Sequence, residues 1–167
     1  MDVAALLKLS AAEKQRIKEL AENDTIYMAR EILGYVTSEV IRYDEAKKQY
    51  VAEVKEGEEW GLSYQGPHKE MAELLDGPDL FKHMEAPRLS YKTTLIIAWC
   101  IRLMCKDPNV RIFYAMATAG EAKKTSDTLR WILESNEKLI ALWGELKPKG
   151  KKGWNQSGFV IAQRTDQ

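Results

Sequence analysis

A nine-residue loop near the middle of the chain constrains the fold more than any other feature. The loop at 86–94 reads Ala-Pro-Arg-Leu-Ser-Tyr-Lys-Thr-Thr, and it follows an apolar-leaning segment at 80–86. A helix-forming run at 94–105 comes directly after it. A loop between a strand and a helix points backbone N–H groups at an anion, and the helix dipole adds a favourable potential there. The order of these segments predicts a phosphate-binding loop.

The loop departs from the phosphate-loop consensus G-x-x-x-x-G-K-[ST] at both glycines. Ala86 and Tyr91 occupy those positions, whereas Lys92 and Thr93 match the consensus. A tyrosine with positive φ before the lysine would cost about 1–2 kcal/mol. We therefore expect either a negative φ at Tyr91 or a strain that ligand contacts offset. The alternative interpretation is an ordinary helix start, capped by Ser90 or Thr93.

The lysine and the threonine of the motif carry the predicted chemistry. Lys92 is expected to reach the β- and γ-phosphates of a nucleotide and to stabilise their charge. The Thr93 hydroxyl is expected to hold Mg²⁺. Backbone N–H groups of residues 89–91 would complete the site. The alternatives are a solvated lysine at a helix start and a threonine that caps the helix.

The spacing Pro87-Arg88-x-x-x-Lys92-Thr93-Thr94 resembles the variant Walker A motif of viral terminase large subunits, the ATPases that package DNA into phage heads. That family often writes the motif as P-R-x-x-x-K-[ST]-T. Segments on both sides are similar to the family in their order and spacing, so that the resemblance covers roughly residues 25–165. These segments are 29–35 (A-x-x-x-L-G-Y), 67–75, 109–118, 122–135 and 136–139.

The resemblance implies an ATP-driven motor that moves double-stranded DNA into a procapsid. Its cofactors would be ATP and Mg²⁺, with Arg88 and Lys92 as catalytic residues and Thr93 as the metal ligand. Its partners would be double-stranded DNA, a small terminase subunit and a portal ring, in the host cytoplasm, with a homo-oligomeric ring for the full-length protein. The implied nucleotide-binding residues are Ala86, Pro87, Arg88, Leu89, Ser90, Tyr91, Lys92, Thr93, Thr94 and His68.

Two of these assignments have open alternatives. Arg88 would contact the γ-phosphate or pair with an acidic residue, and otherwise it is a surface arginine. His68 occupies the place where related motors often carry a glutamine that reads the adenine edge. Tyr64 and Gln65 are candidates for the same role, and a histidine at a helix start without such a role is the simpler interpretation.

The predicted fold is an α/β domain with an incomplete parallel sheet like that of P-loop NTPases. A strand at 80–86, the loop, a helix and an apolar strand at 110–116 form a βαβ unit, which requires a parallel strand pair. Gly158-Phe159-Val160-Ile161-Ala162 suggests a third strand. This core is predicted to occupy 59–167, after a helical N-terminal extension at 1–58.

Capping signals predict several helices. The capping box from Ser10 to Glu13 starts a helix that runs to about residue 21, and Asp24 starts a second helix that ends near Gly34. A polar helix or mixed region is expected at 36–55. Further helices are expected at 68–75, at 121–133 with Thr118 as the cap, and at 139–142.

The composition limits the partners of the chain. Its 25 basic and 25 acidic residues give zero net charge, which argues against a protein that coats nucleic acid by bulk electrostatics. The lysine-rich segment 147–153 could touch DNA phosphates locally, or it is a solvated loop. Cys100 and Cys105 diverge by about 140° around a helix, which favours reduced thiols over a disulfide or a metal pair. No apolar run reaches the length of a membrane span.

A complete ATPase needs a second acidic motif, an apolar strand that ends in aspartate and is followed by glutamate. No such run follows Thr94. We therefore expect the front part of a longer protein, without its Walker B motif and nuclease domain, that binds nucleotide weakly and hydrolyses ATP inefficiently. The alternatives are another P-loop NTPase, helicase-like or kinase-like, and a non-enzymatic α/β interaction protein.

Overall fold

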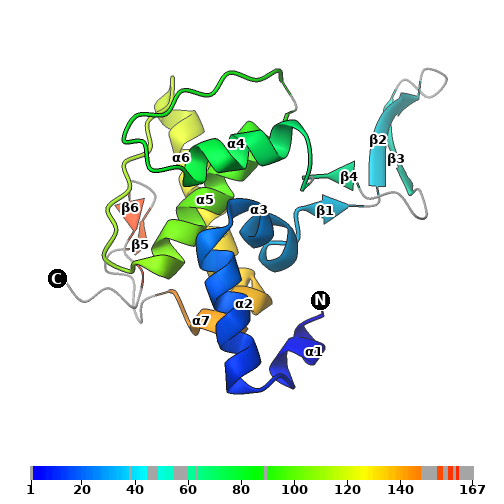
Figure 1. Cartoon of the computed structure of the whole chain (residues 1–167). Coiled ribbons are helices and arrows are strands. Elements are labelled where there is room, and N and C mark those ends of the chain that lie inside the picture. Colours follow the sequence, from blue (N-terminus) through cyan, green and yellow to red (C-terminus); the bar gives the residue numbers. More distant parts are fainter. Residues whose placement is uncertain are drawn as a thin grey trace.

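Helices build the body of the molecule in the computed structural model (Figure 1), which describes residues 2–37, 39–44, 49–54, 60–62, 64–88, 90–147, 154–155, 158–159 and 161. The helices are α1 (Val3–Leu7), α2 (Ala11–Asn23), α3 (Thr25–Tyr27), a π-helical turn η1 (Met28–Ile32), α4 (Pro67–Asp76), α5 (Lys92–Lys106), α6 (Ala119–Ser135) and α7 (Glu137–Trp143). The strands are β1 (Val36–Thr37), β2 (Glu39–Asp44), β3 (Gln49–Val54), β4 (Trp60–Gly61), β5 (Trp154–Asn155) and β6 (Gly158–Phe159).

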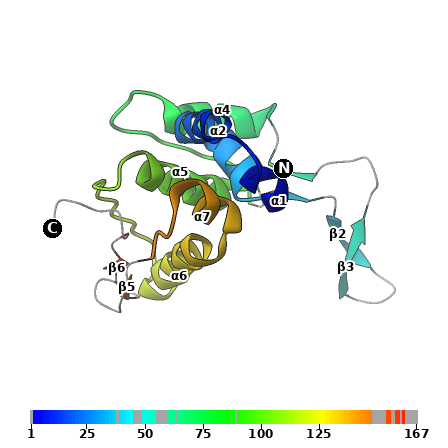
Figure 2. The same cartoon turned by 90° about the horizontal axis from the view of Figure 1, so that it is seen from below.

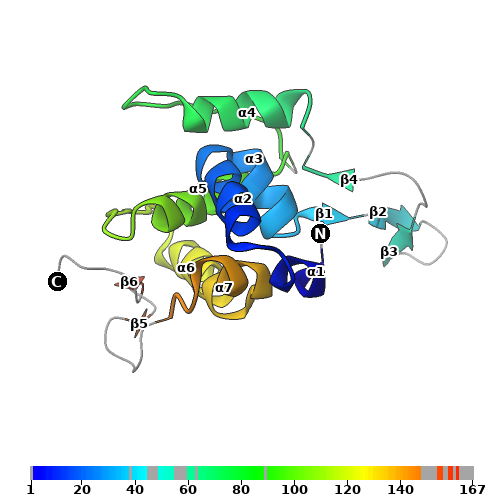
Figure 3. The same ribbon diagram turned by 60° about the horizontal axis from the view of Figure 1, so that its bottom comes forward.

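The helices lie in three tiers, with α5 in the middle one. Figure 3 shows α4 above, α2, α3 and α5 between, and α6 with α7 below. Figure 2 gives the same order from another side, with α5 between α4 and the α6–α7 pair. The chain contacts agree, since α5 touches α2, α3, α4, η1 and α6.

The predicted parallel sheet is wrong. Every described strand pairs in an antiparallel two-stranded ribbon, β1 with β4, β2 with β3 and β5 with β6. The expected strands at 80–86 and 110–116 have no strand partner among the described residues and carry no regular secondary structure. A strand is stable only when a neighbour takes up its backbone hydrogen bonds. The fold is therefore mainly helical, and the α/β class does not apply.

The expected third strand at 158–162 is also corrected in part. β6 exists, but it is short and pairs antiparallel with β5, and residues 160 and 162 lie outside the described part of the chain. Where a polar helix or mixed region was expected at 36–55, the described residues form strands: β1 pairs with β4, and β2 pairs with β3 as an antiparallel hairpin. Its register runs from Glu39 opposite Val54 to Asp44 opposite Gln49, and the hairpin projects from the helical body (Figure 1).

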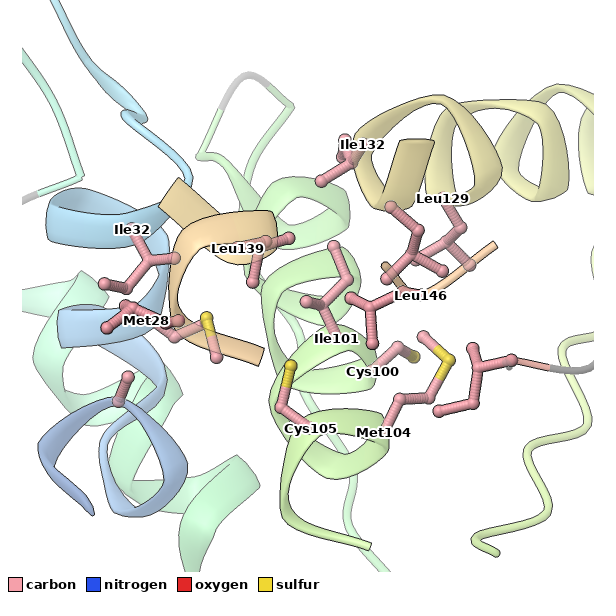
Figure 4. Close-up of a cluster of buried hydrophobic side chains, with 14 of the residues drawn as sticks. Met28, Ile32, Cys100, Ile101, Met104, Cys105, Leu129, Ile132, Leu139 and Leu146 are labelled. Atoms are coloured by element: carbon pink, nitrogen blue, oxygen red, sulfur yellow. The ribbon is translucent and has the colours of Figure 1, made fainter. Parts of the chain in front are cut away.

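Two buried clusters meet on α5. The larger one joins α5 to the N-terminal helices, α6 and α7 (Figure 4), and its fully enclosed members include Met28, Ile101, Leu133 and Leu139. The smaller one lies between α5, α3 and α4. The run 94–105 is apolar on nearly all sides, and a helix of that kind is buried all round. Neighbouring helices, and not a sheet, cover it here.

The capping predictions are confirmed. The Ser10 N–H and Oγ donate to Glu13 Oε2 at 2.8 and 2.7 Å, and these bonds lower the pKa of Glu13. Asp24 accepts from the Tyr27 N–H at the start of α3, and Thr118 accepts from the Glu121 N–H at the start of α6. These signals are local, so they do not depend on tertiary contacts.

The two cysteines are free thiols in the core, as expected. Cys100 and Cys105 are both buried on α5. Burial raises their thiol pKa values to about 11 and about 12, respectively. Both are therefore protonated at neutral pH and are poor nucleophiles and poor metal ligands there.

No helix in the described part of the chain has both the length and the apolar character that crossing a membrane requires. The boundary predicted near residue 58 falls among residues 55–59, which lie outside the described residues, and it stays a prediction. Helices from both sides of that position share the larger core cluster, for example through Met28 and Leu139.

Candidate phosphate-binding loop

Tyr91 has the backbone conformation that the phosphate-loop consensus reserves for glycine. Its φ is 59° and its ψ is 17°, in the left-handed region, and it is the residue directly before α5. Among the described residues it is the only non-glycine residue with positive φ. The sequence left two possibilities for this position, and the structure selects the strained one, at a cost of about 1–2 kcal/mol.

The Lys92 side chain folds back over the loop that precedes it. Its Nζ donates hydrogen bonds to the carbonyl oxygens of Ala86 and Pro87, the latter at 3.0 Å. The Ser90 hydroxyl donates to the same Pro87 carbonyl at 2.8 Å. The acceptors of Lys92 are neutral, and no carboxylate of the described residues pairs with it. Its positive charge therefore remains available to an anion.

The start of α5 presents amides without side-chain acceptors. The first intrahelical bond runs from the Leu95 N–H to the Tyr91 carbonyl at 2.9 Å. The amides of Lys92, Thr93 and Thr94 lie ahead of that bond, where an α-helix has no internal acceptors. No side chain caps this end, so neither Ser90 nor Thr93 takes the capping role of the alternative interpretation. Uncapped N–H groups and the helix dipole together favour an anion.

The other loop residues differ in what the structure shows of them. Arg88 is exposed and makes no hydrogen bond or ion pair with the described residues. Pro87 is exposed and Ala86 is half-buried. Leu89, a predicted nucleotide-binding residue, lies outside the described residues. Arg88 and Lys92 thus place on one loop two positive charges that no carboxylate of the described residues pairs with.

The structure brings His68 to the loop. Its ring meets that of Tyr91 edge-on, with centroids 5.6 Å apart and an angle of 82° between the planes. Burial lowers the pKa of His68, which favours the neutral ring at pH 7. The link between His68 and the strained residue is a contact that the sequence does not reveal, because the two residues lie on different elements.

The alternative base-reading residue Tyr64 is engaged with η1. Its hydroxyl donates to Glu31 Oε1 at 3.3 Å, and the Arg30 guanidinium lies 4.7 Å from its ring centre. Desolvation and the nearby Glu31 charge raise the pKa of Tyr64 to about 12. Gln65 follows it in the same connection before α4.

The chemical groups of the loop are of the types that bind a polyphosphate and its metal ion. Lys92 and Arg88 supply charge, the first amides of α5 supply donors, and the exposed Thr93 hydroxyl offers one oxygen ligand for a hard cation such as Mg²⁺. Among the described residues, no three or more acidic, histidine or cysteine side chains come together in a group that could hold a metal ion by itself. A metal here would depend on phosphate oxygens for the rest of its coordination.

The loop is largely accessible, since Pro87, Arg88, Tyr91 and Thr93 are exposed and its other described residues are half-buried. Neither the cavity of about 510 Å³ between α5 and α6 nor the cavity of about 280 Å³ beside α4 is lined by loop residues. An anion would therefore bind to amides and side chains at the molecular surface, where water competes for every hydrogen bond.

Two substitutions at Tyr91 test its left-handed backbone. Tyr91→Gly and Tyr91→Ala both remove the contact with His68, so they differ only in the Cβ and in the freedom of the unfolded chain. We expect the glycine variant to be more stable by about 0.5–1 kcal/mol. The left-handed conformation costs alanine about 1–2 kcal/mol, and this is more than glycine loses through the greater freedom of its unfolded chain. Urea unfolding followed by circular dichroism measures this difference. A more stable alanine variant would mean that φ at residue 91 is negative.

Comparisons of this chain with models of protein families, with curated proteins and with solved structures give no match.

Proposed function

We propose that the loop at 86–94 binds the phosphates of a nucleoside triphosphate. The observation that carries the proposal is the positive φ of Tyr91 in the position before Lys92, where the phosphate-loop consensus has glycine. A strained backbone persists only where its surroundings enforce it, and such positions cluster at functional sites. The uncapped start of α5 and the charge of Lys92, which no carboxylate of the described residues neutralises, support the same ligand.

Each loop residue has a part in the proposed site. Lys92 Nζ leaves the carbonyls of Ala86 and Pro87 and donates to phosphate oxygens. The amides of Thr93 and Thr94 donate to the same anion, and the Thr93 hydroxyl contributes one ligand to Mg²⁺. Bound ATP with Mg²⁺ would supply the phosphoanhydride bond, and Arg88 and Lys92 would stabilise the charge that develops on the phosphate oxygens as water attacks the γ-phosphorus and ADP leaves.

We further propose that the chain is the N-terminal part of a terminase large subunit, the ATPase that packages viral double-stranded DNA. The support is the order P-R-x-x-x-K-T-T within the loop and the similar segments on either side of it. The small terminase subunit, the portal ring, a homo-oligomeric ring and the host cytoplasm belong to this proposal. The described residues do not form the parallel sheet expected for such an ATPase, so this assignment depends on the order of the motifs in the sequence. Phosphate binding by the start of α5 is a separate proposal and does not need the sheet.

Calorimetric titration with ATP and Mg²⁺ tests the phosphate site. Lys92→Ala is expected to weaken binding by about 10- to 100-fold, the effect of one charged hydrogen bond. Lys82→Ala is the matched control, because Lys82 Nζ also donates to a loop carbonyl, that of Gly77, at 2.7 Å. The control variant should bind as the parent chain does.

Two results would overturn this proposal. One is no binding of ATP by the parent chain, which would leave 88–94 as an ordinary helix start. The other is equal affinity for the parent chain and Lys92→Ala, which would place the nucleotide elsewhere. AMP should bind more weakly than ATP, since the loop is proposed to hold the terminal phosphates.

A further inference from the structure

The start of α4 lies beside the start of α5, where the phosphate loop ends. Met71 and Ala72 of α4 are buried in the smaller cluster together with Leu95 of α5. His68 precedes Met71 by three residues and Ala72 by four, so it lies on the same face of α4, one turn nearer the start of the helix. The packing of α4 on α5 therefore carries His68 to the end of the loop.

Tyr91 lies at the matching place before α5. It precedes the buried Leu95 by four residues, and its carbonyl accepts the first helical hydrogen bond from the Leu95 N–H at 2.9 Å. Its ring meets the ring of His68 edge-on, with 5.6 Å between the centroids. The contact between His68 and Tyr91 thus extends the α4–α5 interface by one turn beyond the buried cluster.

The ring of His68 is what orients the Tyr91 side chain. Neither buried cluster includes Tyr91, which is 41% exposed. Among the described residues, its side chain makes no hydrogen bond or ion pair that would hold it in another way. His68 is half-buried on a helix that packs on both α3 and α5, so its ring is a fixed surface for the tyrosine.

The contact is strong enough to matter for the backbone. An edge-on aromatic pair stabilises a structure by an amount of the same order as the cost of a left-handed tyrosine. Rotation about the Tyr91 N–Cα bond to a negative φ would turn residues 86–90 relative to α5. That rotation would move Arg88 relative to the amides at the start of the helix.

We propose that His68 is a positioning residue of the phosphate loop, whose ring holds Tyr91 in the left-handed conformation that directs the loop and the first amides of α5 to one anion. This inference rests on the proposed phosphate site, and it gives His68 a role other than reading a base. It also accounts for a tyrosine where the consensus has glycine, because the ring supplies a contact that glycine lacks.

Calorimetric titration with ATP and Mg²⁺ tests this role through a pair of substitutions. His68→Ala is expected to weaken binding by about 3- to 10-fold, the effect of one aromatic contact. His68→Phe keeps an aromatic ring and should bind within about 2-fold of the parent chain. Glycine adopts positive φ without support, so adding His68→Ala to Tyr91→Gly should change the affinity by less than about 2-fold.

Met71→Ala separates positioning from general support of α4. Met71 lies in the cluster between α4 and α5, so its truncation opens a cavity and should lower the melting temperature. It leaves the rings of His68 and Tyr91 in place, and we expect its affinity for ATP to stay within about 2-fold of the parent value. A loss of affinity as large as that of His68→Ala would show that His68 only supports the helix and would overturn the proposal.

NMR of the chain without ATP gives a second readout that does not depend on nucleotide binding. The nuclear Overhauser effect between the amide and α protons of one residue is stronger in the left-handed conformation, because the two protons are closer there. This signal at residue 91 should be strong in the parent chain and in His68→Phe, and weaker in His68→Ala.

Two results would overturn the role of His68. One is an undiminished signal at residue 91 in His68→Ala, and the other is an equal loss of affinity from His68→Ala with tyrosine or glycine at position 91. If the parent chain does not bind ATP, the phosphate site fails, and the signal at residue 91 still decides whether His68 holds Tyr91.

Discussion

Replacing Asp76 with alanine is expected to lower the free energy of unfolding by about 3–5 kcal/mol. Asp76 is the last residue of α4. Its carboxylate accepts from the Thr25 N–H at 2.9 Å and from the Thr25 hydroxyl at 2.6 Å, and it pairs with Arg102 Nη2 at 2.8 Å. One carboxylate thus ties α4 to α3 and α5.

The cost is large because Arg102 stays behind. Arg102 is only 6% exposed, and its other terminal nitrogen donates to the Glu22 carbonyl of α2 at 2.8 Å. Without Asp76 its charge is buried beside a single neutral acceptor, and the Thr25 hydroxyl also loses its acceptor. A buried charge without a counter-ion is far less stable than the pair.

Chemical unfolding in urea, followed by circular dichroism, measures this loss. Glu73→Ala is the matched control, since Glu73 pairs with Lys69 at 3.7 Å on the exposed face of the same helix. That variant should change stability by no more than about 0.5 kcal/mol. A loss below about 1 kcal/mol for Asp76→Ala would show that α3, α4 and α5 are not joined as described.

Replacing Ile101 with alanine is expected to cost about 2–5 kcal/mol, by removing apolar contacts and opening a cavity. Ile101 is fully buried on α5, in the cluster where the N-terminal helices meet α6 and α7 (Figure 4). The prediction is specific to the helical packing, because it requires side chains from residues far apart in the sequence, such as Met28 and Leu133, to enclose this one.

Leu20→Ala provides the control for Ile101→Ala. Leu20 is an aliphatic residue of α2 that is 46% exposed, so its truncation should stay within about 0.5 kcal/mol. Both variants are measured by urea unfolding under the same conditions. Equal and small losses for the two would contradict a core centred on α5.

Local signals in the sequence predicted the helices well. Ser10, Asp24 and Thr118 each cap the helix that they were expected to start, because a side-chain oxygen and the next turn of backbone suffice for a cap. α4 (Pro67–Asp76) covers the helix predicted at 68–75. α5 ends just before Asp107-Pro108, where the residue ahead of a proline avoids the helical conformation.

The sheet could not be predicted in the same way. An apolar segment such as 110–116 has the composition of a strand, but a strand exists only where another strand takes its hydrogen bonds. The β2–β3 strand pair was missed because Arg42, Asp44 and Glu53 interrupt its apolar pattern, although Ile41, Tyr43 and Val51 favour a strand.

The candidate site was predicted in outline and not in geometry. The sequence singled out Lys92 and the residue before it, and it could not choose between the two signs of φ at Tyr91. The contact of His68 with Tyr91 and the return of Lys92 to the carbonyls of Ala86 and Pro87 are tertiary and loop features. No spacing in the sequence encodes them.

The central claim, that the loop and the start of α5 bind phosphate through their amides, is tested most directly by ¹⁵N NMR of the chain during titration with ATP and Mg²⁺. We expect saturable shifts of the Lys92, Thr93 and Thr94 amide signals that are the largest in the spectrum and are lost in Lys92→Ala. If these three signals stay fixed while ATP is added, the loop does not hold the phosphates and the claim is wrong.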